Sequence, residues 1–160
     1  MSSAMCVSAT GVPVDKLLAT LDEDKHYVAG YFDGEGSIGL YRKRKKSGEV
    51  YAVAVRVTVT QQEPDIIVWL HSVFGGRLVR YSRPNSVYWV LSIESIDVCL
   101  CFLRWIIPSL RSPSKKSQAI MLLDYCNNYK TLSLEQKMII CDSIKAVKMG
   151  VKEVKGVSYG

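Results

Sequence analysis

The sequence has no cysteine spacing typical of a metal site or of a disulfide framework. None of the cysteines stands in a CxxC pair, and their number is odd. This pattern argues against a zinc site and against a set of structural disulfides. Two of them, Cys99 and Cys101, lie inside an apolar run, where buried thiols are expected. The expected setting is reducing and intracellular, either an organelle (chloroplast or mitochondrion) or the cytoplasm of a prokaryote.

Long apolar stretches are also missing. No run of about 18 apolar residues is present, so we expect no membrane span. The first 20 residues lack the charged-then-apolar order of a secretory signal, and residues 1–20 are interpreted as an N-terminal lead-in. A chain of 160 residues can bury one core but not two, so residues 21–160 are predicted to form a single domain.

The charge balance favours a polyanionic partner. Lys and Arg number 21 against 15 Asp and Glu, which gives a net charge of +6. Hydrophobic residues make up 48% and charged residues 22%, as in a globular protein. A basic excess of this size is compatible with nucleic-acid binding but does not establish it.

The hydropathy pattern predicts an α+β fold in the order α-β-β-α-β-β-α, with further helices at the C-terminus. Residues 51–60 alternate cleanly with a period of two, as in a strand with one buried face. The first helix is expected to end near Gly34, because glycine suits a left-handed exit. Pro108 is expected to stop the third helix. The predicted helices cover about 22–35, 65–74, 96–107, 117–127 and 133–148, the predicted strands about 37–42, 51–60, 77–82 and 87–93, and residues 111–116 are predicted to be a polar loop.

The end of the first helix carries the chemistry. Gly30 and Gly34 are four residues apart on one helical face, with Ala29 beside them, and small residues at that spacing let two helices approach closely. Asp33 and Glu35 lie at the negative end of the helix dipole, where two acids are unfavourable unless a cation binds. Carboxylate and carbonyl oxygens are the ligands that Mg²⁺ or Ca²⁺ prefers. The alternative is a solvated acidic helix end whose glycines only form the turn.

The segment from Val28 to Gly36, VAGYFDGEG, resembles the nine-residue LAGLIDADG motif of the homing endonucleases in residue type at every position. The predicted element order is similar to the family fold over roughly residues 22–127. The resemblance implies a site-specific double-strand DNA endonuclease, intron-encoded, that hydrolyses phosphodiesters with Mg²⁺, which Ca²⁺ or Mn²⁺ replaces in binding. Because one motif is visible, the chain resembles the homodimeric members, which cut long pseudo-palindromic targets.

The resemblance also implies roles for individual residues. Glu35 and the carbonyl of Gly34 would bind the metal, although the family commonly has Asp in place of Glu35. Gln61, at the end of the second strand, would orient water, and Lys115 would neutralise charge near the cut phosphate. The alternatives are an exposed strand-end glutamine and a solvated loop lysine. The additional basic residue that some members carry after the glutamine is missing here. The motif helix would pair with that of a second subunit through Ala29, Gly30, Asp33 and Gly34.

A β-ribbon fits the major groove, so the outward faces of the strands form the predicted DNA-binding surface. The basic residues at the outer end of the sheet suit phosphate contacts. The predicted DNA-binding residues are Tyr41, Arg42, Lys43, Arg44, Lys46, Arg56, Thr58, Arg80, Ser82, Tyr88 and Lys116.

Two other functions are compatible with the same fold. One is an intron-splicing maturase or a DNA-binding regulator that does not cleave. The other is a monomeric nucleic-acid-binding domain. Retention of Glu35, Gln61 and Lys115 favours the endonuclease.

Overall fold

The computed structural model describes the backbone of residues 22–156 and the side chains of residues 24–150. The lead-in expected at residues 1–20 lies outside the described residues. The element order is α2 (Asp22–Glu35), β1 (Gly36–Arg44), β2 (Val50–Gln61), α3 (Asp65–Phe74), β3 (Arg77–Arg83), β4 (Ser86–Ile93), α4 (Ile96–Ile106), η1 (Ile107–Ser109), α5 (Pro113–Asn128), η2 (Tyr129–Thr131) and α6 (Leu134–Gly156). The predicted α+β order, with extra C-terminal helices, is confirmed.

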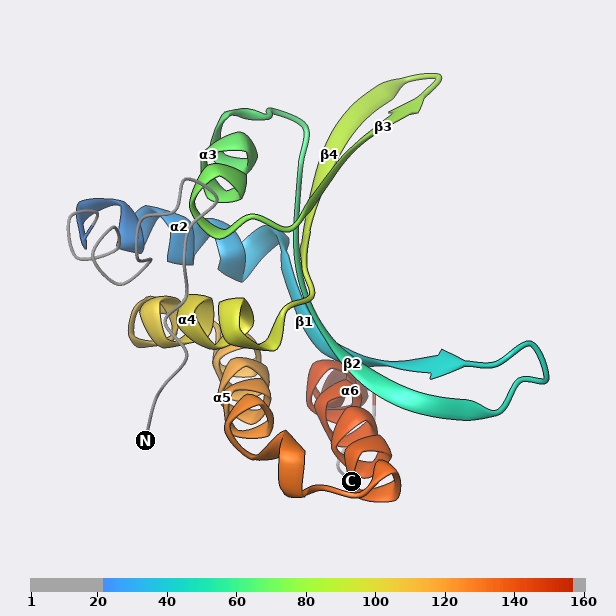
Figure 1. The fold of residues 1–160 in the computed structure, drawn as a ribbon. Helices are drawn as coiled ribbons and strands as arrows, with labels where there is room; N and C mark the ends of the chain where they lie inside the picture. Colours follow the sequence, from blue (N-terminus) through green and yellow to red (C-terminus); the bar gives the residue numbers. More distant parts are fainter. Residues whose placement is uncertain (1–21, 157–160) are drawn as a thin grey trace.

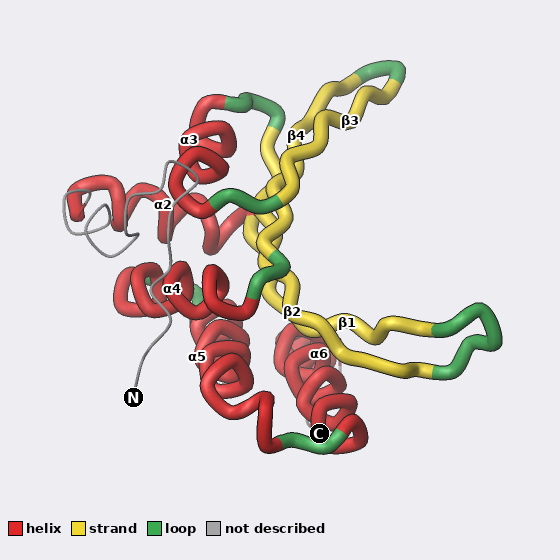
Figure 2. Tube along the Cα trace, in the orientation of Figure 1, coloured by secondary structure: helices red, strands yellow, loops and turns green. Residues whose placement is uncertain are grey.

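The four strands form one antiparallel sheet in the order β1-β2-β4-β3. All helices lie on one face of the sheet, and the other face carries no helix of the described chain (Figure 1). The two hairpins, β1–β2 and β3–β4, curve away from the helical layer, so the uncovered face is concave (Figure 2). This arrangement leaves a long, open β-surface of the kind that the hydropathy pattern predicts.

The hydrophobic core lies between the sheet and the helices. The alternation in β2 buries Val55, Val57 and Val59 against the helical layer, as the period of two predicts. From α2, Phe32 packs edge-on against Phe102 of α4, with ring centroids 5.4 Å apart. The alternation does not bury Tyr51, because the outer end of β2 extends past the helices.

The passage from α2 to β1 differs from the predicted left-handed turn. The described glycines with positive φ are Gly48, Gly75 and Gly76, so neither Gly34 nor Gly36 uses the left-handed region. The helix instead passes directly into the strand. At Gly36 the reason for glycine is steric, because a Cβ there would lie 2.3 Å from the Phe32 ring.

The start of α5 corrects the predicted polar loop at 111–116. The Ser112 hydroxyl accepts a hydrogen bond from the backbone N–H of Lys115, 3.2 Å away, and Pro113 occupies the first helical position. Serine as N-cap and proline directly after it are favourable at a helix start. Lys115 and Lys116 therefore lie in the first turn of a helix. The α-helix before Pro108 ends at Ile106, as the proline predicts, and the short 3-10 turn η1 follows it.

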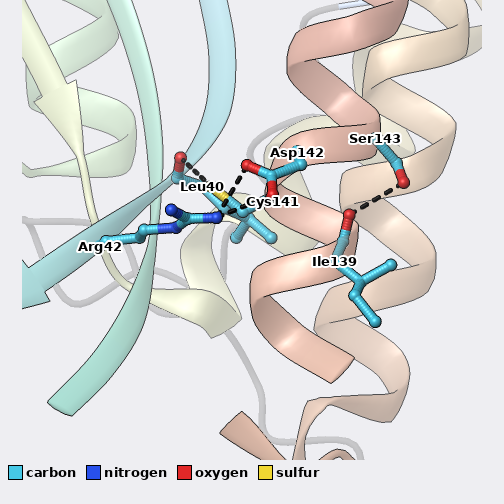
Figure 3. Close-up of polar contacts among 6 residues, drawn as sticks. All are labelled: Leu40, Arg42, Ile139, Cys141, Asp142 and Ser143. Carbon is cyan, nitrogen blue, oxygen red and sulfur yellow. Dashed lines mark hydrogen bonds and ion pairs between the residues drawn. The ribbon is translucent and has the colours of Figure 1, made fainter. Parts of the chain in front are cut away.

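The C-terminal helix α6 docks on the back of β1 (Figure 3). The Cys141 thiol donates to the carbonyl of Leu40 at 3.1 Å. At the next position of α6, Asp142 accepts hydrogen bonds from the Arg42 guanidinium on both carboxylate oxygens, each 2.8 Å away. Cys141 and Ile144 are fully buried beneath the sheet. These contacts fix α6 against β1, and α6 also packs against α5.

Three of the cysteines, Cys99, Cys126 and Cys141, are buried free thiols. Cys101 is buried as well, but it is disulfide-bonded, which corrects the expectation of a thiol there. Within the described residues, no helix is both long enough and apolar enough to cross a membrane.

Candidate active site and nucleic-acid interface

The carboxylate of Glu35 lies at the C-terminal end of α2 and is exposed. It lines a shallow hollow together with residues from the ends of β2 and β4, namely Thr60, Gln61, Gln62 and Tyr88. Two of the predicted catalytic residues, Glu35 and Gln61, are thus brought together although 26 positions separate them in the chain. The hollow combines a carboxylate with neutral side chains that donate and accept hydrogen bonds.

Lys115 reaches the same helix end from α5. Its ammonium donates to the backbone carbonyl of Gly36, directly after Glu35, and lies 5.7 Å from the centre of the Phe32 ring. The pKa of Lys115 is below its ordinary value, chiefly because the group is partly buried and then because of the positive charge of Lys148. Asp33 and Glu35 oppose that shift. The structure therefore places a cation beside the acidic end of α2.

The two acids of the motif have different surroundings. Asp33 accepts hydrogen bonds from the backbone N–H groups of Arg111 and Ser112, at 2.8 and 3.2 Å. Its carboxylate therefore holds the segment that leads into α5 and so positions Lys115. Glu35 has no hydrogen bond or ion pair among the interactions of the described residues. Only Glu35 is available for a ligand.

Tyr31 is a residue of this site that the sequence interpretation missed. Its hydroxyl donates to the backbone carbonyl of Thr60 at 3.5 Å and so ties α2 to the end of β2. Burial, followed by the charge of Glu35, raises the pKa of Tyr31 to about 12. The hydrogen bond to Thr60 keeps Glu35, at the end of α2, close to Gln61, at the end of β2. An aromatic residue within the motif helix gave no signal of this contact.

One chain offers an incomplete set of metal ligands. Across residues 22–156, no three His, Cys, Asp or Glu side chains are grouped so that they could hold a metal ion. The end of α2 does supply one free carboxylate, Glu35, together with the unpaired carbonyls of the last helical turn. Oxygen donors of this kind suit Mg²⁺ or Ca²⁺, which complete their coordination with water and substrate oxygens. The donor chemistry fits such an ion if a second source of oxygen ligands is present.

The exposed stripe of α2 consists of Tyr27, Gly30 and Gly34. It contains only two of the four residues predicted to pair with a second subunit. Gly30 and Gly34 are exposed, and no atom of the chain lies within 4 Å of a Cβ placed on either. Tyr27, one turn before Gly30, is 63% exposed. Ala29 is fully buried in the core of its own chain, so its predicted place at a subunit interface is wrong. Asp33, half-buried and bonded to the α5 segment, does not lie on this stripe either.

The open face of the sheet carries part of the predicted DNA-binding set. Residues that pair directly across neighbouring strands point to the same face of the sheet. The β1 and β4 residues that pair with the buried valines of β2 therefore face the helices. By this register Tyr41, Lys43, Arg56, Thr58 and Tyr88 lie on the open face. Arg44 and Lys46 belong to the exposed tip of the β1–β2 hairpin, and Lys116 is exposed at the start of α5.

Arg56 on this open face is held by neighbours. Its guanidinium lies 4.0 Å above the ring of Tyr41 and bonds the carboxylate of Glu94 at 3.0 Å. Glu94, which follows β4, was not among the predicted residues. It places a negative charge beside Tyr41 and Arg56, and it orients the Arg56 guanidinium.

The face assigned to β3 was wrong. Arg80 lies opposite Trp89, and Ser82 lies opposite Val87, so both are on the helix side of the sheet. The Arg80 guanidinium lies 6.0 Å from the Trp89 ring. The residues of β3 on the open face are Arg77, Val79, Tyr81 and Arg83.

The β3 error had a signal in the sequence. The turn at Pro84–Asn85 has two residues, so Arg83 must pair with Ser86, and this pairing sets the face of every residue in β3. Tyr81 stacks on Tyr88, with ring centroids 5.1 Å apart, and Arg83 lies 5.4 Å from the Tyr88 ring.

Arg42 is a second correction. The predicted basic residues were expected on the side of the strands away from the core, but Arg42 shares the face of Leu40 and bonds Asp142 of α6. Its guanidinium is therefore part of the contact between the sheet and α6, and not of the open face (Figure 3).

No family model and no curated protein matches this sequence. Solved structures do match it. The homing endonuclease I-CvuI, in complex with a DNA target, superposes with a TM-score of 0.62 and 18% identity over 79% of this chain and 83% of that one. The group I intron-encoded homing endonuclease I-CeuI, complexed with DNA, gives 0.62 and 22% over 82% and 76%. The chain has the LAGLIDADG homing endonuclease fold.

A third match concerns a longer chain of this fold. The LAGLIDADG homing endonuclease I-GzeII, in complex with its DNA target, gives a TM-score of 0.56 and 15% identity over 77% of this chain. Only 43% of the I-GzeII chain is covered. This chain therefore corresponds to about one half of that molecule. In this chain, Glu35, Gln61 and Lys115 meet at the end of α2.

Proposed function

We propose that this chain is a subunit of a site-specific, metal-dependent DNA endonuclease that works as a homodimer on a long pseudo-palindromic duplex. The observation that carries the proposal is the meeting of Glu35, Gln61 and Lys115 at the end of α2. These residues come from α2, β2 and α5, and they supply an anionic oxygen, a polar amide and a cation. Phosphodiester hydrolysis needs such groups around the reacting phosphate.

The homodimer is supported by the exposed stripe of α2. Gly30 and Gly34 leave open space where a Cβ would project, and glycine inside a helix costs about 1 kcal/mol relative to alanine. A second α2 packed on this stripe would offset that cost. The two Glu35 carboxylates would then lie near a common axis, which supplies the ligands that one chain lacks. The half-length match to I-GzeII is consistent with such pairing of two copies.

Glu35 and the carbonyl of Gly34 would hold Mg²⁺, which supplies charge stabilisation at the phosphate and lowers the pKa of water when bound. Structures of I-CvuI with DNA were obtained in the presence of Mg or Ca. The remaining roles belong to the protein. The amide of Gln61 would orient the attacking water, and Lys115 would place its ammonium against the phosphate oxygens. Tyr31 holds these groups together through its bond to Thr60.

The concave open face would bind the duplex. A β-ribbon enters the major groove, and the face carries aromatic, hydroxyl and basic side chains, among them Arg56, Thr58 and Arg83. In a homodimer, each sheet would read one half of the target, about one helical turn of DNA. The hairpin tip with Arg44 and Lys46 suits contact with phosphates at the outer end.

The test is cleavage of duplex DNA that carries the insertion site of the reading frame, in Mg²⁺, in Ca²⁺ and in EDTA. We expect both strands to be cut in Mg²⁺ and the duplex to be bound but uncut in Ca²⁺. Tight binding without cleavage in Mg²⁺ and Mn²⁺ would favour a non-cleaving maturase or regulator. The acidic segment after Gln61, with Glu63 and Asp65 where a cation would strengthen the site, makes that second outcome a specific alternative.

A further inference from the structure

The segment after Gln61 contains no lysine or arginine, so any further positive charge at the site must come from the helices around it. Between Gln61 and the first turn of α3, the charged side chains are those of Glu63 and Asp65. At the end of α2, positive charge comes from the ammonium of Lys115. A phosphate at this position would meet the carboxylate of Glu35 and one cation, Lys115, unless another element contributes positive charge.

Helix α6 runs along the back of β1 toward this site. Cys141 contacts Leu40 in the middle of β1, and Asp142 contacts Arg42, two residues nearer the hairpin. From Leu40 back to Gly36 the strand covers about 13 Å. Lys148 follows Cys141 by seven residues, or about 10 Å along the helix axis. The helix advances toward the end of α2, because Val147 contacts Ser114 at the start of α5, next to the segment that Asp33 of α2 binds.

Lys148 lies on the same face of α6 as the buried residues that pack against the sheet. Lys148 is four residues after Ile144 and seven after Cys141, and both of these are buried. Residues at those spacings lie on one face of a helix. Lys148 itself is exposed, so its aliphatic stem leaves the protein at the edge of the packed face.

A direct contact joins this turn of α6 to the residue before Lys115. The hydroxyl of Ser114 donates to the carbonyl of Val147 at 3.4 Å. The amide of Gln118, which is buried, donates to the same Ser114 oxygen at 3.1 Å and fixes it. Lys115 and Lys148 each follow one member of this pair in the chain. The positive charge of Lys148 is accordingly one cause of the lowered pKa of Lys115.

We propose that Lys148 is a second cation of the cleavage site, which binds the DNA phosphate backbone next to the cut. This inference rests on the proposed function. Two ammonium groups that approach each other without a shared anion repel, and a phosphate between or beside them removes that repulsion. Glu35 would help to hold the metal ion, and Lys115 with Lys148 would add positive charge against the phosphate oxygens.

The experiment compares Lys148→Met and Lys148→Arg with Lys130→Met. Lys130 is exposed in η2 at the opposite end of α5, so its replacement removes the same charge far from the site. Two quantities are measured for each variant and for the wild type. They are the single-turnover cutting rate at saturating protein and the salt dependence of binding to a non-specific duplex. Thermal unfolding is recorded in parallel.

We expect Lys148→Met to lower the cutting rate roughly tenfold and to reduce the slope of log K against log salt by about 0.9. Lys148→Arg should restore both, and Lys130→Met should change neither. Equal cutting rates and salt slopes for Lys148→Met and Lys130→Met would overturn the inference, as would a failure of Lys148→Arg to restore them. If the wild type itself does not cut, the proposed function fails, and the salt slope alone decides whether Lys148 contacts phosphate.

Discussion

At the scale of single residues, Asp33 and Glu35 show how two acids in one motif take different tasks. Asp33 accepts two backbone N–H groups and fixes the start of α5, whereas Glu35 points into the hollow beside Gln61. The sequence placed both acids at a helix end, and the family resemblance assigned the metal to Glu35. It could not show the partners of Asp33, because Arg111 and Ser112 lie 78 and 79 positions away in the chain.

Gly36 allows a prediction at this scale. A Cβ at position 36 would lie 2.3 Å from the ring of Phe32, which is fully buried and packed against Phe102. Because the ring has little room to move, Gly36→Ala should lower the free energy of unfolding by about 1–3 kcal/mol. Urea denaturation measures this change.

The matched control is Gly39→Ala in the same strand, where nothing lies within 4 Å of the added methyl group. Its effect on the unfolding free energy should stay within about 0.5 kcal/mol. Equal losses for the two variants would show that strand propensity, and not the Phe32 ring, explains glycine at position 36.

At the scale of elements, α2 has a buried face and an exposed stripe, and the glycines lie on the stripe. The four-residue spacing of Gly30 and Gly34 predicted a close-packing surface from the sequence. The same reasoning placed Ala29 there, but a small residue is equally suited to a tight core contact, and the structure buries it. Spacing alone cannot distinguish the two uses of a small side chain.

Gly30→Ala tests the use of that stripe. The isolated helix should gain up to about 1 kcal/mol, because alanine is the better helix former and its methyl group meets no atom of the chain. The homodimer should weaken, since the added methyl groups separate the paired helices. We expect the dissociation constant, measured by sedimentation, to rise roughly tenfold.

Gly150→Ala in α6 provides the comparison, because its added methyl group also meets nothing within 4 Å. It should stabilise the chain in the same way without changing the dissociation constant. A Gly30→Ala protein that dimerises as tightly as Gly150→Ala would remove α2 from the interface.

The β3–β4 hairpin supplies a second prediction at the element scale. Arg83 lies on the open face over the Tyr88 ring, and Arg80 lies on the opposite face over Trp89. Arg83→Ala should weaken duplex binding and lower the salt slope by about 0.9, because one phosphate or base contact is lost. Arg80→Ala should change the slope much less. Fluorescence anisotropy over a salt series measures both, and the reverse order would place the DNA on the other face.

This hairpin also shows where the prediction from sequence ended. The strands and the two-residue turn were predicted within one or two residues, since alternation and Pro84–Asn85 are local signals. The face of β3 was wrong because its own alternation is weak: Arg77, Arg80 and Arg83 are spaced by three residues and occur on both faces. Pairing with β4 decides the face, and pairing is a property of two strands.

At the scale of the whole molecule, the helical layer assembles the candidate active site, and the sheet provides the open face. The helical layer brings α2, the end of β2 and the first turn of α5 to one point, and the open concave face extends from that point along both hairpins (Figure 1). The element order, and with it the fold, was predictable because each element has a local pattern. The approach of α6 to the site was not, since it depends on contacts between residues 40–42 and 141–142.

The central claim is that Glu35, and not its neighbour Asp33, carries the cleavage chemistry of a metal-dependent endonuclease. The measurement is the cutting rate of target duplex in Mg²⁺ by wild type, Glu35→Gln and Asp33→Asn, with thermal unfolding of each. Glu35→Gln should cut at least about 100-fold more slowly while it unfolds at the wild-type temperature and binds DNA in Ca²⁺. Asp33→Asn should unfold more easily, by about 1–3 kcal/mol, and lose less activity. Cutting by Glu35→Gln at the wild-type rate would contradict the account.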